Sequence, residues 1–411
     1  MRPPASTVGR VNRDDLEVLL TPKALRLLDE YAELDTVSDA VGAVMTLRKA
    51  GVDAHMSSVV LTQLQLRRRA RAKFGKFATN MLFTDAGLAQ ATRLQVAARH
   101  ADRFRRAEVR TLADLGCGIG ADSLAFASLG LDLLSVDTDE LTAAIASFNL
   151  APFSNARVEH STAEATNLDG VEGVFLDPAR RTESRGGTRR LADPDDWRPS
   201  LGFAFDVAAN GRAAGVKLGP AMPHELLPPS TASRPVETQW LSVEGELVEC
   251  AVWLGATARA GVRRSALVLR DGAHELTSAG AASEDAPVGE LGEFLYEPDP
   301  ALIRGRFIGE LAGLLGGHMI SPEIAWVTAP ELHETPFAQV FRVREVLPLH
   351  ASSLKKRLRD LGIGRLEIKK RGVDLDPAKF RKELQPRGDN AATLICTRVD
   401  ERRVAILADR A

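Results

Sequence analysis

The feature that most constrains the fold of this chain is a glycine-rich turn from Leu112 to Gly120. The turn carries glycine at positions 116, 118 and 120. Glycines at alternate positions permit positive φ values and remove the Cβ atoms that would keep a ligand away from the backbone. Apolar residues precede the turn. Within residues 121–129, apolar residues recur at the spacing of a helix. The pattern predicts a strand, a turn and a helix whose unsatisfied N–H groups face a small ligand.

Acidic residues end several of the predicted strands. Asp114 precedes the glycines, Asp137 ends the stretch 131–137, and Asp177 ends the stretch 173–177. Since ligands of open α/β sheets bind at the carboxyl ends of strands, these acids are expected to meet in one crevice. Asp137 follows the glycines by about 20 residues, a spacing that suits a carboxylate accepting hydrogen bonds from a ribose diol. A dinucleotide-binding fold is the main alternative for the glycine turn taken alone.

In these motifs the chain resembles the class I S-adenosylmethionine-dependent methyltransferases. The resemblance implies a Rossmann-like α/β fold, with a mostly parallel sheet ending in an antiparallel edge hairpin at residues 238–254. It also implies S-adenosylmethionine as the cofactor, held by residues of four motifs. The implied cofactor-binding residues are Asp114, Gly116, Cys117, Gly118, Ile119, Gly120, Asp137, Thr138, Thr162, Ala163, Asp177 and Pro178.

Two of these motifs depart from the family pattern. Thr162 stands where the adenine-side motif usually has aspartate. Asp177-Pro178-Ala179-Arg180 stands where enzymes acting on planar amino nitrogens often have Asp/Asn-Pro-Pro-aromatic. The resemblance implies that Asp177 orients or deprotonates a nitrogen and that Arg180 stacks on a base in place of the aromatic ring. The alternative for Asp177 is a cap of backbone N–H groups.

The lead-in at residues 77–92 is similar to that of the cap-guanine-N2 methyltransferase group. The resemblance implies that Phe83 and Thr84 contact the methionine end of the cofactor. In the alternative interpretation, Phe83 and its apolar neighbours pack against the first helix of the core. After Asp177, residues 180–190 form a polar stretch with five arginines, which predicts a loop. This loop is either a lid that grips an anionic substrate or ordinary surface.

Residues 14–75 show helical periodicity. We expect helices that start at Thr21-Pro22, at Ser38 and at Ser58, each with a capping hydroxyl. The third of these ends in a basic run at residues 66–76, which contains six Lys and Arg residues. The run is either a solvated helix end, where cations suit the dipole, or a surface that contacts phosphates.

From these patterns we predict an N-terminal helical domain at residues 1–76, a methyltransferase domain at 77–272, a linker at 273–289 and an α+β domain at 290–411. The last domain is expected to hold helices at 300–315, at 352–361 with Ser352 as the cap, and at 377–384. It resembles the THUMP-like domain attached to some bacterial methyltransferases, and true THUMP domains accompany RNA-modifying enzymes.

The charge of the chain is unevenly distributed. Residues 340–411 contain 18 Lys and Arg against 10 Asp and Glu, a net charge of +8, whereas the whole chain carries -2. The three cysteines form no C-x-x-C pair, and the eight histidines do not have the spacing of metal ligands, so we expect no metal site. The cysteine pattern also fits a protein that resides in the reducing cytosol. Because no apolar stretch is long enough for a signal peptide or a membrane span, we expect a cytoplasmic protein without a membrane partner.

The sequence therefore predicts an S-adenosylmethionine-dependent methyltransferase that acts on a nitrogen of an RNA base. The expected RNA contacts are the N-terminal basic run and the C-terminal domain. Two alternatives stay open: the same chemistry on a protein or a small molecule, and an RNA-binding protein whose cofactor pocket is not catalytic. The substrate RNA, the methylated atom and the oligomeric state do not follow from the sequence.

Overall fold

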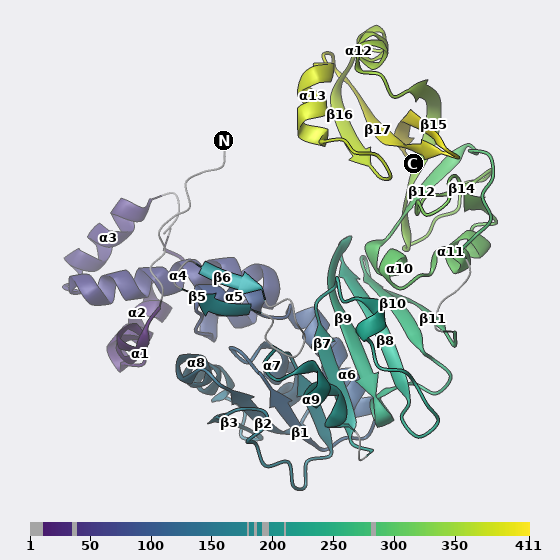
Figure 1. Cartoon of the computed structure of the whole chain (residues 1–411). Coiled ribbons are helices and arrows are strands. Elements are labelled where there is room, and N and C mark those ends of the chain that lie inside the picture. The colour runs from purple at the N-terminus through teal and green to yellow at the C-terminus, as the bar shows by residue number, and fades with distance from the viewer. Residues whose placement is uncertain are drawn as a thin grey trace. The chain divides into compact units, whose positions relative to one another are not determined.

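The computed structural model describes residues 11–34, 39–178, 181–184, 187–190, 197–208, 211–280 and 285–411 (Figure 1). The chain folds as two compact units, each assembled from separate stretches of sequence. Unit 1 comprises Met1–Leu218, Pro228–Val236 and Val252–Ala258, and unit 2 comprises Gly219–Leu227, Glu237–Ala251 and Arg259–Ala411.

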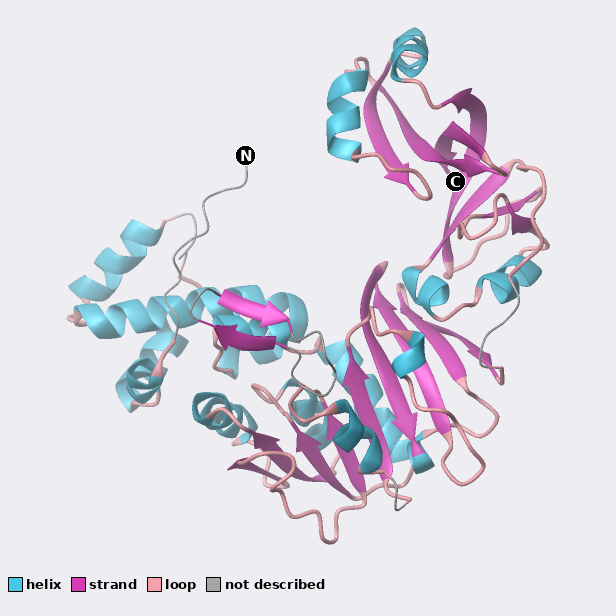
Figure 2. Cartoon of the chain, in the orientation of Figure 1, coloured by secondary structure: helices cyan, strands magenta, loops and turns pink. Residues whose placement is uncertain are grey.

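The N-terminal part of unit 1 is helical, as Figure 2 shows in cyan. Its elements are α1 (Arg13–Leu19), α2 (Pro22–Glu30), α3 (Ala40–Lys49), α4 (Ala54–Phe74) and the short 3-10 helix η1 (Gly75–Asn80). The predicted start of α2 is confirmed, because the Thr21 hydroxyl accepts the N–H of Ala24 at 3.2 Å.

The predicted starts of the other two helices need correction. The α4 helix begins after Asp53, whose carboxylate accepts the N–H of Met56 at 2.9 Å, so the prediction of Ser58 as its cap was wrong. Aspartate caps a helix as well as serine does, and the whole turn between Asp53 and Ser58 is helical. The cap of α3 is Asp39. Ser38, the predicted cap, lies outside the described residues.

A block of five parallel strands follows the helices and confirms the predicted class I methyltransferase fold. Its strands have the order β7-β4-β1-β2-β3. The elements of this part are α5 (Asp85–Gln90), α6 (Leu94–Arg106), β1 (Thr111–Leu115), α7 (Ala121–Ser128), β2 (Asp132–Asp137), α8 (Glu140–Leu150), β3 (Ala156–His160), β4 (Gly173–Leu176), α9 (Leu201–Asp206) and β7 (Ala213–Leu218). Since β1 is central, the turn that follows it lies between the carboxyl ends of its two neighbours.

The sheet has nine strands, in the order β11-β10-β8-β9-β7-β4-β1-β2-β3. The additional strands are β8 (Val236–Val243), β9 (Glu246–Leu254), β10 (Arg264–Leu269) and β11 (Ala273–Ser278), with η4 (Gly255–Thr257) after β9. The predicted hairpin of β8 and β9 is confirmed. It does not form the edge, however, because β10 pairs with β8 in parallel and β11 pairs with β10 in antiparallel orientation.

Two segments expected to lack regular structure contain strands. β11 lies within the expected linker at 273–289, and its polar composition is typical of an edge strand. In the stretch expected as a loop, β5 (Arg181–Ser184) and β6 (Gly187–Arg190) pair as a two-stranded ribbon. Because the residues of these strands are largely polar, the sequence shows no alternation of apolar and polar residues that would predict a strand. The bounds of the four predicted segments stay a prediction.

The rest of unit 2 is α+β, as predicted. A seven-stranded sheet has the order β13-β14-β12-β15-β18-β17-β16. The elements are η3 (His224–Leu226), β12 (Phe294–Pro298), α10 (Pro300–Arg304), α11 (Ile308–Leu314), β13 (His318–Met319), β14 (Val327–Ala329), β15 (Ala338–Pro348), α12 (Ala351–Asp360), β16 (Ile363–Lys370), α13 (Pro377–Leu384), β17 (Asn390–Val399) and β18 (Arg402–Arg410). Ser352 lies inside α12 rather than at its cap, which is His350.

The single helix predicted at 300–315 is broken into α10 and α11. Arg306 has a positive φ of 55°, and Phe307 is fully buried. The Arg264 guanidinium lies 4.1 Å from the centroid of the Phe307 ring and donates to the carbonyl of Arg306 at 2.8 Å. These contacts come from β10, far away in sequence, so the helical period alone could not reveal the break.

Close packing around β7 generates a first prediction. A Cβ on Gly215 would lie 2.6 Å from the ring of Trp253 and 3.1 Å from the ring of Phe175. We therefore expect Gly215→Ala to lower the free energy of unfolding by about 1–3 kcal/mol, the usual cost of overpacking. Urea denaturation measures it, with Gly202→Ala in α9 as the control, because within the described part of the chain only Ser200 Oγ, at 4.0 Å, lies near that position. Equal stability of both variants would contradict the packing described here.

Candidate functional site

The glycine turn is held between the ends of β2 and β4. Gly116 and Cys117 donate their N–H groups to the Val136 carbonyl at 2.8 and 3.0 Å. Gly116 has a φ of 93°, and a Cβ at this position would lie 3.0 Å from the carbonyl oxygen of Asp177. Both the backbone conformation and the close approach therefore require glycine here.

The second and third glycines shape the entrance to α7. Gly118 has a φ of 57°, and apart from its own chain neighbours no atom of the described residues lies within 4 Å of the position where its Cβ would be. Gly120 has a φ of 86° and is the N-cap of α7. The turn thus leaves open space beside its backbone at Gly118, which fits the approach of a ligand.

Asp137 lies at the end of β2 with its carboxylate directed at the turn. Oδ2 accepts the N–H of Gly118 and Oδ1 accepts the N–H of Asp139, each at 2.9 Å. Burial raises the pKa of this carboxyl above its usual value, while the two N–H donors act in the opposite direction. The side chain is half-buried, so the carboxylate is both oriented and accessible to a hydroxyl donor.

Asp114 occupies a different kind of environment, because its side chain is only 1% exposed. Its Oδ2 accepts the hydroxyl of Ser123 at 2.5 Å, and the hydroxyls of Ser123 and Ser135 lie 2.9 Å apart. These bonds join β1, α7 and β2. The carboxyl is thus engaged inside the protein, and a direct contact between Asp114 and the cofactor stays a prediction.

The pKa of Asp114 is raised to about 8. Burial is the main cause, and the negative charges of Asp122 and Asp177 add to it, whereas the Ser123 hydroxyl and the Lys217 charge oppose it. At neutral pH the Asp114 carboxyl is therefore mainly protonated and acts as a neutral hydrogen-bonding group.

Asp177 follows β4 and pairs with a residue that the sequence analysis missed. Its Oδ2 lies 2.5 Å from Nζ of Lys217, near the end of the adjacent strand β7. The Lys217 side chain is largely buried, while that of Asp177 remains partly exposed. The sequence signal that could have revealed Lys217 was its position as the single charged residue in the otherwise apolar stretch 213–218. The pairing itself follows only from the strand order.

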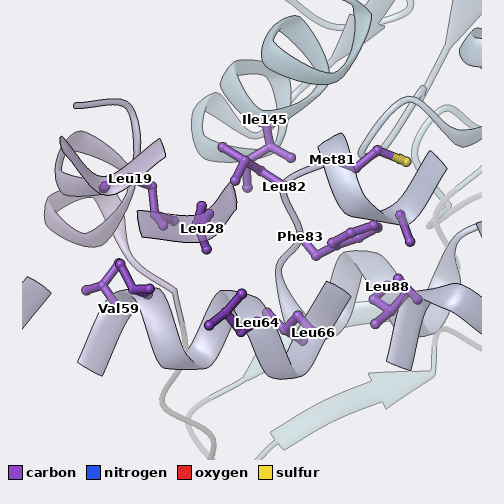
Figure 3. Packing of buried hydrophobic residues seen from close by; sticks show 14 of the residues in the cluster. Leu19, Leu28, Val59, Leu64, Leu66, Met81, Leu82, Phe83, Leu88 and Ile145 are labelled. Carbon is purple, nitrogen blue, oxygen red and sulfur yellow. The ribbon is translucent and has the colours of Figure 1, made fainter. Parts of the chain in front are cut away.

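Phe83 and Thr84 lie in a connecting segment at residues 81–84. The Phe83 ring is fully buried, and its centroid lies 5.6 Å from that of Phe74. Figure 3 shows it within the same cluster as Leu82 and Ile145. The Thr84 hydroxyl accepts the N–H of Gly87 at 2.9 Å and caps α5. These surroundings support the packing interpretation of Phe83, and a cofactor contact of Thr84 stays a prediction.

A buried amide that the sequence analysis overlooked attaches this segment to the glycine turn. Asn149 of α8 donates to the carbonyl of Ile119 at 2.9 Å and to that of Leu82 at 3.1 Å. Its Oδ1 accepts the N–H of Leu82 at 2.8 Å. The signal was one amide side chain in the apolar stretch 140–150, but its partners are distant in sequence.

The residues expected on the adenine side lie beyond the ends of β2 and β3. Thr138 is exposed, and its carbonyl oxygen lies 3.1 Å from Nε2 of His160. The Thr162 hydroxyl accepts the N–H of Ala165 at 3.1 Å and so stabilises a turn. Ala163 is buried. Because Asp137 and His160 are paired in register, these residues share one edge of the sheet with Asp137.

A second buried polar cluster was also missed. Asp122, in the first turn of α7, accepts the Thr92 hydroxyl at 2.6 Å and lies 2.7 Å from Nδ1 of His100. Burial would raise the pKa of Asp122, but the charge and hydrogen bond of His100 outweigh it, so the pKa is lowered. The ionised Asp122 carboxylate lies close enough to Asp114 to raise the pKa of Asp114. No local sequence pattern signals it, because the three residues come from different elements.

The cysteines lack the environment of a nucleophile. Burial raises the pKa of the Cys117 thiol, and the carboxyls of Asp114 and Asp137 add to this effect. Burial likewise raises the pKa of Cys250 and Cys396. All three thiols are therefore protonated at neutral pH, in agreement with a reaction that forms no cysteine adduct.

Arg180 lies outside the described residues. Among the residues that the structure describes, no group of three or more His, Cys, Asp and Glu side chains is arranged to hold a metal ion. Within the same ranges, no helix has the length and apolar character needed to cross a membrane.

A five-stranded parallel block with a glycine turn after its central strand and an acid at the end of the next strand is typical of Rossmann-like folds that bind a ribose-containing cofactor, and the class I methyltransferases have such a fold. An uncharacterized S-adenosylmethionine-dependent methyltransferase found in two strains of Mycobacterium tuberculosis is 31% identical over 342 residues, which cover 81% of this chain and 90% of the relative. The chain belongs to this family of S-adenosylmethionine-dependent methyltransferases, and S-adenosylmethionine is its cofactor.

Further comparisons concern the flanking regions and the fold. Residues 338–410 match the family described as THUMP domain-like, and residues 12–70 match a domain of unknown function. The structure is similar to that of a protein from Porphyromonas gingivalis W83 assigned as a methyltransferase, with a TM-score of 0.70 and 19% identity. That match covers 96% of this chain and 98% of the other, and it supports the fold throughout. The predicted relation to the cap-guanine-N2 group stays a prediction.

The raised pKa of Asp114 generates a second prediction. Because its folded-state pKa of about 8 exceeds that of an unfolded aspartate, about 3.9, the wild-type protein loses stability as the pH rises between these values. Asp114→Asn places a neutral group of the same shape there. We expect the variant to gain roughly 1.4 kcal/mol per pH unit relative to the wild type between pH 5 and 8, and to gain no more above that range. Chemical denaturation at several pH values measures this difference, and a constant difference would contradict the assignment.

Proposed function

We propose that this methyltransferase transfers the methyl group of its cofactor to a nitrogen of an RNA base. The observation that carries the RNA assignment is the THUMP domain-like segment at residues 338–410, together with the cations on its two helices. α12 and α13 are neighbours, and they expose lysine and arginine side chains. These exposed cations are Lys356, Arg359, Lys379, Arg381 and Lys382. Such a surface suits phosphate contacts, which supply most of the sequence-independent affinity for nucleic acid.

For the cofactor, we propose that Asp137 accepts hydrogen bonds from the ribose hydroxyls. Its carboxylate is already oriented by the N–H groups of Gly118 and Asp139. The open space at Gly118 allows the cofactor to approach the backbone. Thr138, Thr162 and Ala163 belong to the proposed adenine side of the same edge.

For the reaction, we propose that Asp177 orients the amino group of the target base. The bound cofactor supplies an electrophilic methyl group on a sulfonium, so the protein needs mainly to align the nucleophile. The Asp177 carboxylate accepts a hydrogen bond from the substrate N–H, and Lys217 holds that carboxylate in place. Pro178 restricts the backbone at the same point. Arg180, two residues after Pro178, is proposed to stack on the base.

The proposed ribose contact leads to a third prediction. Asp137→Ala removes a charged acceptor of two hydroxyl hydrogen bonds, so we expect the dissociation constant of S-adenosylmethionine to rise by at least about tenfold. Calorimetric titration measures it. Asp132→Ala is the matched control, because Asp132 is an exposed acid at the opposite end of the same strand. Unchanged cofactor affinity in the Asp137 variant would rule out this ribose site.

The test of the function uses S-adenosylmethionine labelled in its methyl group, incubated with total RNA and, separately, with total protein from cells lacking this enzyme. We expect label in RNA, and digestion to nucleosides then identifies the base. Label only in protein, or only in small molecules, would contradict the RNA assignment. Absence of label from every fraction would favour a cofactor pocket without catalysis.

The same assay gives a fourth prediction, for Asp177. We expect Asp177→Asn to lower methylation of RNA by roughly a hundredfold or more, the usual contribution of a positioned acid or base, while cofactor affinity changes little. An equal loss of cofactor affinity and methylation would instead assign Asp177 to cofactor binding. Asp132→Asn again serves as the control.

A further inference from the structure

The segment at residues 81–92 borders the glycine turn and is attached to helix α4 by buried side chains. Gln63 is fully buried, and its amide forms two hydrogen bonds with Phe83. Its Nε2 donates to the Phe83 carbonyl at 2.6 Å, and its Oε1 accepts the Phe83 N–H at 3.1 Å. Nε of Arg67 donates to the carbonyl of Met81 at 2.9 Å. Two side chains of α4 thus fix the backbone at the start of the segment.

Lys73, in the last turn of α4, holds the other end of the segment. Its Nζ donates to the carbonyl oxygens of Leu88, Ala89 and Ala91 at 2.9, 2.9 and 2.7 Å. These carbonyls lie at the end of the short helix α5, where the last carbonyls of a helix have no partner within the helix. An ammonium group suits this position, because it carries three donors and its charge is favourable at a helix C-terminus. Lys73 therefore fixes α5 to α4.

The same segment contacts the glycine turn on its other side. Asn149 of α8 binds both backbone groups of Leu82 and donates to the carbonyl of Ile119 in the turn at 2.9 Å. In α5, a Cβ on Gly87 would lie 2.5 Å from Cγ2 of Ile119, so the backbone of this helix packs directly against that side chain. Ile119 follows Gly118, whose N–H orients the proposed ribose acceptor. A shift of α5 therefore displaces the turn beside the proposed ribose site.

We propose that Lys73 is a positioning residue for S-adenosylmethionine: by holding α5 against the glycine turn, it keeps the turn in the conformation that binds the cofactor. Lys73 acts through α5, because its ammonium group is bound to the carbonyls of that helix. The proposal also gives a role to α4, most of which lies in the region that matches a domain of unknown function. It rests on the proposed cofactor site at the turn and does not depend on the RNA substrate.

The charge of the cofactor makes the expected effect specific. S-adenosylmethionine carries a net positive charge at neutral pH, because its sulfonium and ammonium groups outweigh its single carboxylate. Removal of a cation from the protein would, through electrostatics alone, favour the binding of this ligand. Loss of a positioning contact weakens the binding instead. The direction of the change in affinity therefore separates the two effects.

The test is calorimetric titration of full-length variants with S-adenosylmethionine, together with urea denaturation of each variant. Lys73→Met replaces the ammonium group by an apolar end, whereas Lys73→Arg retains a cation with several donors. The matched control is Lys76→Met, which removes an exposed lysine three residues further along the chain. Asp137→Ala tests the cofactor site itself. A second variant, Gly87→Ala, acts on the opposite side of α5 and leaves Lys73 in place.

We expect Lys73→Met to raise the dissociation constant of S-adenosylmethionine roughly tenfold, and Lys73→Arg to stay within about threefold of the wild type. Lys76→Met should leave the constant unchanged or slightly lower. Gly87→Ala should raise it, because the added Cβ pushes α5 away from Ile119.

Two results would overturn the proposal while Asp137→Ala weakens binding as expected. One is unchanged or tighter binding in Lys73→Met, and the other is an equal effect of Lys73→Met and Lys76→Met. If Lys73→Met also loses much of its resistance to urea, Gly87→Ala decides, and unchanged cofactor affinity in that variant would contradict the positioning role of α5. If Asp137→Ala has no effect either, the proposed cofactor site is wrong and the inference fails with it.

Discussion

The approach of the Gly116 backbone to the Asp177 carbonyl is the constraint on which the rest of the site depends. A Cβ at this position would lie only 3.0 Å from that oxygen, so only glycine lets the turn after β1 lie this close to the end of β4. On the other side, two N–H groups of the turn bind the Val136 carbonyl at the end of β2. The turn is thereby held between its two neighbouring strands. Asp137 and Asp177 consequently lie on either side of the same short stretch of backbone.

Polar groups buried below this turn keep its supporting elements together. Asp114, Ser123 and Ser135 join β1, α7 and β2, while Asp122 binds residues of the segment and helix that precede β1. Two buried carboxyls in one region cannot both be ionised without cost, and the structure resolves this through His100 beside Asp122 and a proton on Asp114. The polar interior therefore carries less charge than the sequence indicates.

The regularity of the local patterns explains which expectations were confirmed. Glycines, strand-ending acids and apolar strands predicted the parallel block, the cofactor and the α+β domain correctly, because each signal lies within a few residues of sequence. The errors arose where distant residues intervene: Arg264 accompanies the break before Phe307, and the paired strands β10 and β11 extend the sheet through the expected linker. Lys217, Asn149 and Asp122 were missed for the same reason, since their partners come from other elements.

The sequence alone indicated the class of protein, because four of its motifs resemble those of the class I methyltransferases, and among them the glycine turn and the acid at the next strand end suit a ribose-containing cofactor. It also determined the uneven charge along the chain. Only the tertiary structure decided which side chains meet: that Asp177 pairs with Lys217, that Phe83 is buried beside Phe74, and that Asn149 binds the carbonyl of Ile119. Strand order and helix packing bring together residues tens of positions apart, and no local pattern records those distances.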